Sequence, residues 1–200
     1  EVVVYDSFNV SDTVSATQGG AFSGPIFSNT LGTSNLRIGK HAGDSIASGG
    51  NFNVVLGDEA GTALTTGDEN TFIGYAAGDA ITTAVKNVAV GHASLSADTL
   101  GNASVAIGHD ALRLQNFTTA TNTYNTAIGF AAGEVITTGI KNVIIGAEAG
   151  DGAQTIDESV IIGYGAGTAV MTGHDNTIVG ASAGAALTAG ASNVAVGYSA

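Results

Sequence analysis

An aliphatic residue followed by glycine recurs along most of the chain at a nearly constant spacing. The ten glycines are Gly39, Gly57, Gly74, Gly91, Gly108, Gly129, Gly146, Gly163, Gly180 and Gly197. Seven of the nine successive spacings are 17 residues, one is 18 and one is 21. A fixed short period indicates an architecture in which each unit cannot fold alone and packs on the next.

The positions around each glycine repeat as well. Asn stands four residues before eight of the ten glycines, with Ser104 and Ser159 in the other two units, and Ala stands three residues after nine of them. Asn side chains stacked in successive units can pair their amides along the stack. We therefore assign these positions to a repeat corner, represented by Asn70, Gly74, Asn87, Gly91, Asn142, Gly146, Asn176 and Gly180.

A unit of 17 residues is too short for a pair of helices and suits short strands joined by tight turns. We predict an all-β fold, a parallel β-solenoid or β-roll of about ten 17-residue coils over residues 35–200. With strands roughly 4.8 Å apart, ten coils would form a rod about 48 Å long.

The strand segments are apolar on both faces. In "NVIIG" (142–146), Val143 and Ile145 point one way and Ile144 points the other. One face can fill the interior of the coil, and the other needs a second surface. We assign the position of Ile144 to an interchain face, which also holds Phe72, Ile161 and Ile178. Because so long an apolar stripe exceeds what a soluble monomer exposes, we predict a homotrimer.

Several units resemble those of a known family. The segments "NASVAIGHDA" (102–111), "NTAIGFAAG" (125–133) and "NVAVGYSA" (193–200) are similar to the S-V-A-I-G repeats in the heads of trimeric autotransporter adhesins and to repeats in phage tail fibres. The resemblance covers about residues 35–200. It implies a trimeric, left-handed parallel β-roll whose strand residues pack inside and between chains. The 17-residue unit is longer than the usual adhesin-head coil, so the handedness stays open.

Two regions depart from the repeat. Residues 1–34 lack the period, and we predict an N-terminal cap or a connecting and assembly segment there. The unit between Gly108 and Gly129 is four residues longer than its neighbours, which predicts a longer loop at 113–125. Loops on a repeat scaffold often bind, although a bulge that only tolerates length is the alternative. The candidate receptor-contact residues are Gln115, Asn116, Phe117, Thr121, Asn122 and Tyr124.

The charge and the motifs argue against several functions. Seventeen acidic against five basic residues give a formal charge of −12, which disfavours nucleic acid and anionic lipid as partners. No apolar run is long enough for membrane insertion. Gly163, Gly165 and Gly167 imitate a dinucleotide fingerprint, but the helix and the downstream acid are missing. We find no credible nucleophile, base and acid, and predict a protein that is not an enzyme and has no cofactor.

The residue after the corner glycine is aromatic or histidine in several units. His92 and His109 occupy equivalent positions in adjacent units and could share a metal ion. The sequence offers no evident third ligand, so we predict no metal site. Tyr75 and Phe130 could stack on neutral sugars, but packing between neighbouring coils is the favoured interpretation.

These observations predict a non-enzymatic extracellular or virion protein that forms the rigid shaft or head of an adhesin or tail fibre. Its expected partners are two further copies of itself and a host-surface glycan or protein receptor. The alternative is a subunit that polymerises end to end into an extracellular filament through residues 1–34. Bacterial and phage origins both remain open.

Overall fold

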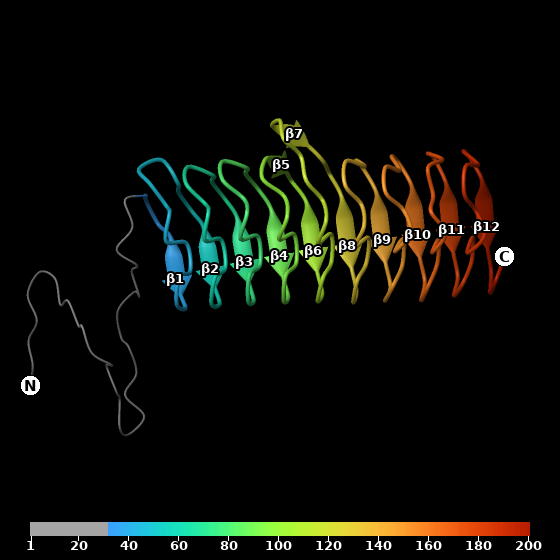
Figure 1. Ribbon diagram of the computed structural model, residues 1–200, viewed down its shortest axis with the longest axis horizontal. Coiled ribbons are helices and arrows are strands. Elements are labelled where there is room, and N and C mark those ends of the chain that lie inside the picture. The colour runs from blue at the N-terminus through green and yellow to red at the C-terminus, as the bar shows by residue number, and fades with distance from the viewer. Residues whose placement is uncertain (1–31) are drawn as a thin grey trace, which may run out of the picture.

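The chain folds into an all-β parallel solenoid of about nine turns. The computed structural model describes residues 32–200, and no helix occurs among them. The predicted terminal segment at 1–34 lies, apart from its last three residues, outside the described residues. Figure 1 shows the coils as a single row along the long axis, in chain order from β1 to β12.

Each coil contributes one three-residue strand to a ten-stranded sheet, except where the insertion adds two short strands of its own. The ten strands are β1 (Leu36–Ile38), β2 (Val54–Leu56), β3 (Thr71–Ile73), β4 (Val88–Val90), β6 (Val105–Ile107), β8 (Thr126–Ile128), β9 (Val143–Ile145), β10 (Val160–Ile162), β11 (Thr177–Val179) and β12 (Val194–Val196). A separate pair is formed by β5 (Gly101–Asn102) and β7 (Thr121–Asn122).

The coils stack in register with the repeat. Val143 pairs with Thr126 on one side and Val160 on the other, and every other neighbouring pair of strands is parallel and equally aligned. The register places Lys141 beside Glu158, whose Nζ and Oε1 atoms lie 2.5 Å apart, as the period predicts. Glu69 and Lys86 occupy the same two positions four strands earlier, but they do not form an ion pair in the described chain.

The middle residue of each main-sheet strand from β2 to β11 is buried inside the coil. Phe72, Ile144, Ile161 and Ile178 are completely buried within a single chain. Their assignment to an interchain face is therefore wrong. Strand alternation was correctly expected to separate two apolar faces, but the residues on either side of these four are the ones that face outward.

The opposite wall of the interior is built from small residues and one larger aliphatic column. The Ala that follows the corner glycine by three is buried in the coils, at Ala42, Ala60, Ala77, Ala111, Ala132, Ala149, Ala166 and Ala183. Seven residues after the glycine stand the buried Ile46, Leu64, Ile81 and Ile136. The interior is thus a narrow, mostly apolar column that no single coil could bury alone, with the buried Asp98 and Gln115 as its polar exceptions.

A ladder of buried asparagines lines one corner. The side-chain oxygen of Asn53 accepts hydrogen bonds from the backbone N–H and the side-chain amide of Asn70, at 2.9 and 3.1 Å. The Asn70 amide also donates to the carbonyl of Ala84 at 2.9 Å. The same set recurs at Asn142. Each buried amide is satisfied by the coils next to it, so the ladder ties neighbouring coils together.

The glycine at the corner is required by space as well as by conformation. Gly74 has φ of +133°, and a Cβ atom there would lie 2.4 Å from the carbonyl oxygen of Gly91. Any side chain at this position would collide with the backbone of the next coil. The close approach of successive corners therefore depends on this glycine.

Candidate functional site

The outer face of the main sheet is a continuous array of aliphatic and threonine side chains. It consists of the first and third residues of the ten strands, which are Val, Ile, Leu or Thr in every strand. Ile38, Leu56, Ile107 and Ile128 are each between 37% and 47% exposed. We call these residues the outer strand face. An apolar surface of this extent typically marks an interface.

The insertion forms a projection beside the middle of the rod. Its strand β7 pairs in parallel with β5; in Figure 1 β5 lies at the edge of the row of coils and β7 projects beyond it. Among the candidate receptor-contact residues, Asn116, Asn122 and Tyr124 are exposed and Thr121 is half-buried. Gln115 and Phe117 are buried, so their assignment as receptor contacts is wrong. The exposed residues 118–120, which were not among the candidates, complete the accessible part of the loop.

A buried carboxylate anchors the insertion. Asp98 is completely buried, and its Oδ1 accepts hydrogen bonds from the backbone N–H groups of Gly101 and Phe117 at 3.0 and 3.1 Å. Its Oδ2 accepts a hydrogen bond from Nε2 of Gln115 at 2.6 Å. Three donors therefore compensate the burial of this side chain. They fix the start of the loop against the preceding coil.

Gln115 also connects the asparagine ladder across the coil that has Ser104 in place of Asn. Ser104 replaces Asn in its coil, and Nε2 of Gln115 donates to its Oγ atom at 2.9 Å. Oε1 of Gln115 accepts a hydrogen bond from the Asn125 amide at 2.8 Å, and Thr123 lies 2.5 Å from the Ser104 hydroxyl. The buried polar column thus passes through the insertion without an unpaired amide. Gln115 stands seven residues after Gly108, in the column filled elsewhere by buried Ile and Leu.

Four rings stack along one corner of the rod. The centroid distances are 5.1 Å from Tyr75 to His92, 4.6 Å from His92 to His109 and 5.4 Å from His109 to Phe130. The pairing expected of His92 and His109 is present, and their rings are almost parallel, at 6°. Ring faces within the stack contact one another, as expected for packing between coils. A hydrogen bond to the Glu59 carboxylate, together with its negative charge, raises the pKa of Tyr75 at the end of the stack.

A shallow, open hollow near the N-terminal end of the described chain is lined by polar groups. His41, Ser45, Glu59, Thr62 and Asp79 contribute to it. Burial raises the pKa of Asp79, and the negative charge of Glu59 adds to this effect, while the N–H groups of Asp79 and Ala80 oppose it. Oδ1 of Asp79 is buried without a hydrogen-bond partner.

The fold and its surfaces define the class of this protein as a parallel β-solenoid with an outer apolar sheet face and one projecting loop. Comparison with family models, with curated proteins and with solved structures found no match. Within residues 32–200, no helix is long and apolar enough to cross a membrane.

Proposed function

We propose that this protein is a non-enzymatic segment of an extracellular or virion-borne fibre, the shaft or head of an adhesin or tail fibre. The observation that carries the proposal is the outer strand face, an array of aliphatic and threonine side chains that runs over all ten strands. A chain with such a face gains most by burying it against copies of itself. A homotrimer around this face would form a thicker rod from which three insertions project.

The interior of the coil supports a mechanical role. Coils joined by parallel strand pairing, by the asparagine ladder and by the apolar column resist bending because every polar group in the corner already has a partner in the next coil. A rod of this kind holds a binding loop away from the surface that carries it. We assign receptor contact to the exposed residues Asn116, Asn122 and Tyr124 and to residues 118–120.

The oligomer is tested by placing charges on the outer strand face. Val143 and Ile145 point outward from β9, so the double variant Val143→Lys and Ile145→Lys would bury two cations per chain in a trimer. The matched control changes the exposed Gln154 and Thr155 to lysine, which adds the same charge elsewhere on the rod. Light scattering after size-exclusion chromatography should give a trimer for the wild type and the control and a monomer for the face variant.

A wild-type chain that runs as a monomer at micromolar concentration would refute the trimer. Equal masses for the face variant and the control would show that an oligomer uses another surface. Circular dichroism on all three proteins separates loss of assembly from loss of the fold.

Receptor binding is tested on the loop alone. The triple variant Asn116→Ala, Asn122→Ala and Tyr124→Ala removes exposed side chains and leaves the buried Asp98 and Gln115 anchor intact. We expect an unchanged rod by negative-stain microscopy and loss of binding to glycan arrays or host-cell surfaces. Binding that survives the triple variant would exclude these three side chains as the contact.

Assembly into filaments is the second candidate. Strands β1 and β12 each pair on one side only within the described chain, and such edges can accept a strand from another molecule. In that case negative-stain images would show long polymers that disappear when residues 1–34 are removed. Short rods of uniform length, with or without those residues, would exclude this alternative.

A further inference from the structure

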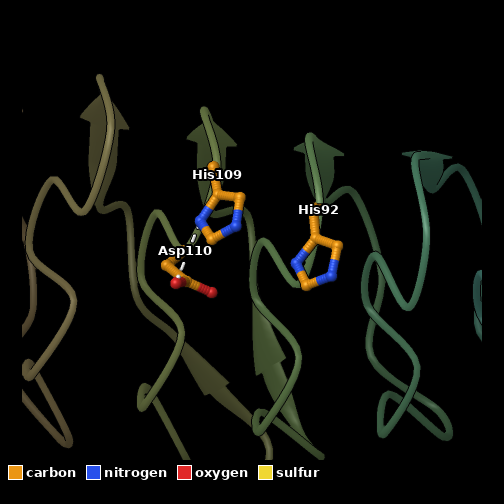
Figure 2. Close-up of side chains that lie close together, drawn as sticks. All are labelled: His92, His109 and Asp110. Atoms are coloured by element: carbon orange, nitrogen blue, oxygen red, sulfur yellow. Dashed lines mark ion pairs between the residues drawn. The ribbon is translucent and has the colours of Figure 1, made fainter.

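The corner that follows β4 and β6 brings three potential metal ligands together. His92 follows β4 directly after its corner glycine, while His109 and Asp110 follow β6 in the next coil. One ligand atom from each side chain can be chosen so that all three lie within 4.8 Å of one another. Figure 2 shows the two imidazoles projecting from consecutive coils on the same side, with Asp110 next to His109.

We propose that His92, His109 and Asp110 form a binding site for one divalent transition-metal ion of the class that imidazole ligands select, such as Zn²⁺ or Cu²⁺. Two neutral imidazoles and one carboxylate are a donor set that both ions accept, with water in the remaining positions. The ion would join two coils directly before the insertion. This site lies outside the outer strand face and outside the proposed receptor loop, and it does not depend on either.

The distances suit a shared ion. Nδ1 of His109 and Oδ2 of Asp110 are 2.9 Å apart. Two ligand atoms bound to one zinc ion at about 2.0–2.1 Å are separated by roughly 2.9–3.4 Å. The His109 and Asp110 pair therefore already has the spacing of adjacent ligands, and a ligand atom of His92 lies within 4.8 Å of both. To bind the same ion, the His92 imidazole must turn out of its parallel stack with His109, because the nitrogen lone pairs lie in the ring planes.

The backbone holds the ligand-bearing residues of the two coils together. The Asp110 N–H donates to the carbonyl of His92 at 3.0 Å, which fixes the carboxylate-bearing residue against the histidine of the preceding coil. Asp110 has φ of +58°, a conformation that Asp tolerates better than most residues. This backbone preorganisation lowers the cost of binding. Tyr75 and Phe130 stack on the outer faces of the two imidazoles, and binding exchanges part of this stacking for coordination of the ion.

The charged groups around Asp110 leave one of its carboxylate oxygens available to bind the ion. Nε of Arg113 lies 3.6 Å from Oδ1 of Asp110, but this guanidinium is shared with Glu134, to which it donates through both Nε and a terminal nitrogen. Oδ2 of Asp110 faces His109 instead. Both histidines are exposed, so an ion can reach them from solvent.

The chain supplies a matched control within itself. His174 lies 3.5 Å from a carboxylate oxygen of Asp157, also in the neighbouring coil, but it has no second histidine beside it. If one histidine and one carboxylate were enough, an ion could also bind at His174. Because the proposed site needs two histidines, we expect His174→Gln to leave metal binding unchanged.

The test titrates the tag-free full chain with ZnCl₂ by isothermal calorimetry and with CuCl₂ by electron paramagnetic resonance. We expect one ion per chain, with hyperfine coupling to two nitrogens for Cu²⁺. His92→Gln should reduce the coupling to one nitrogen. His92→Gln, His109→Gln and Asp110→Asn should each weaken Zn²⁺ binding at least about tenfold.

Circular dichroism before each titration confirms that the variants keep the fold, and Asp110→Asn is chosen because Asn also tolerates a positive φ. The proposal is overturned if the wild type binds no Zn²⁺ at concentrations up to the millimolar range. It is equally overturned if His174→Gln weakens binding as much as His92→Gln does, because the site would then not be the one at this corner.

Discussion

The coils that carry β9 to β11 and the coils that carry β4 and β6 solve the same packing problem in different ways. In the first group, which we call the regular coils, large middle residues such as Ile144 and Ile161 fill the interior and glycine stands opposite them at Gly150 and Gly167. In the second group, the insertion coils, the middle residues are Ala89 and Ala106, and Leu95 and Leu112 stand where the others have glycine.

This exchange keeps the interior filled, but it places two leucines in a strained backbone conformation. Leu95 and Leu112 are completely buried, with φ of +53° and +49°, a left-handed conformation that leucine seldom adopts. A Cβ added at Gly184 would lie 2.9 Å from Cδ1 of Ile178, so this regular coil has no room for a side chain there. The interior accepts a large residue from either wall of the coil, but only one at a time.

The same two groups differ in polarity. The regular coils satisfy their corner with Asn142, Asn176 and the hydroxyl of Ser159, which accepts a hydrogen bond from the Asn176 N–H. The insertion coils instead replace two aliphatic positions of the interior with Asp98 and Gln115. These two side chains hold the loop and bridge the ladder at Ser104. The insertion coils therefore lose some apolar packing, and the polar side chains that replace it hold the projecting loop in a fixed position.

Removing the anchor of the insertion coils should have the largest effect on stability. Asp98→Ala leaves the N–H groups of Gly101 and Phe117 and the amide of Gln115 without their acceptor. Because unsatisfied buried donors cost about 1–3 kcal/mol each, we expect the free energy of unfolding to fall by about 4 kcal/mol. Urea denaturation followed by circular dichroism measures the change.

Asp98→Asn is the control for this prediction, because it keeps one acceptor oxygen for the two backbone donors. It should cost about half as much as Asp98→Ala. If both variants unfold at the wild-type urea concentration, the anchor contributes nothing and the insertion is held by its own strands β5 and β7.

Converting an insertion coil to the pattern of the regular coils should have an intermediate effect on the free energy of unfolding. Leu112→Gly relieves the left-handed leucine but opens a cavity beside Gly133, whose hypothetical Cβ would lie 3.2 Å from the Leu112 side chain. A cavity cost of about 2–5 kcal/mol less a strain relief of about 1–2 kcal/mol predicts a net loss of about 2 kcal/mol. Adding Ala106→Ile should restore more than half of it, because the new side chain enters from the opposite wall.

A double-mutant cycle of Leu112→Gly and Ala106→Ile measures this exchange directly. The single variant Ala106→Ile should destabilise the protein by overpacking. Additive effects of the two substitutions would contradict the idea that both walls share one volume.

The period made the solenoid, its register and the corner asparagines predictable, because position-specific residues recur every 17 residues. The direction of the strand faces was not predictable from alternation alone. Ile144 and its neighbours Val143 and Ile145 are all aliphatic, and only the position of the alanine wall decides that Ile144 points inward. A usable signal was nevertheless present for Gln115, which occupies the column of Ile81 and Ile136 and could have been recognised as buried.

The proposed metal ligands show a different limit of prediction from the sequence. The repeat aligned His92 with His109, but Asp110 follows His109 in the chain, and its approach depends on a positive φ that no period reveals. Asp98 stands seven residues after Gly91, in the same column as Gln115, so the period could have marked it as buried. Its partners were not predictable, because they are the N–H groups of Gly101 and Phe117 and the amide of Gln115, which only the path of the insertion brings together.

The smallest predicted effect comes from Asp79. One of its carboxylate oxygens has no hydrogen-bond partner, whereas both oxygens of Asp98 are paired. Asp79 lies near the end of the rod, where its Oδ1 has no hydrogen-bond partner and burial raises its pKa. The raised pKa means that the folded state binds the proton more tightly than the unfolded state, whose Asp pKa is about 3.9. Stability therefore falls as the pH rises through the window between these two pKa values, and the penalty is fully present above the folded-state pKa.

Asp79→Asn removes this charge and should raise the free energy of unfolding at pH 7 by less than about 1 kcal/mol, since solvent screens a half-buried group. The gain should shrink as the pH falls and vanish below about pH 4, where the wild-type carboxyl is protonated in both states. Thermal melts of both proteins between pH 3 and pH 8 measure it. A gain that stays constant across this range would show that packing, and not the desolvated charge, separates Asp79 from the fully satisfied Asp98.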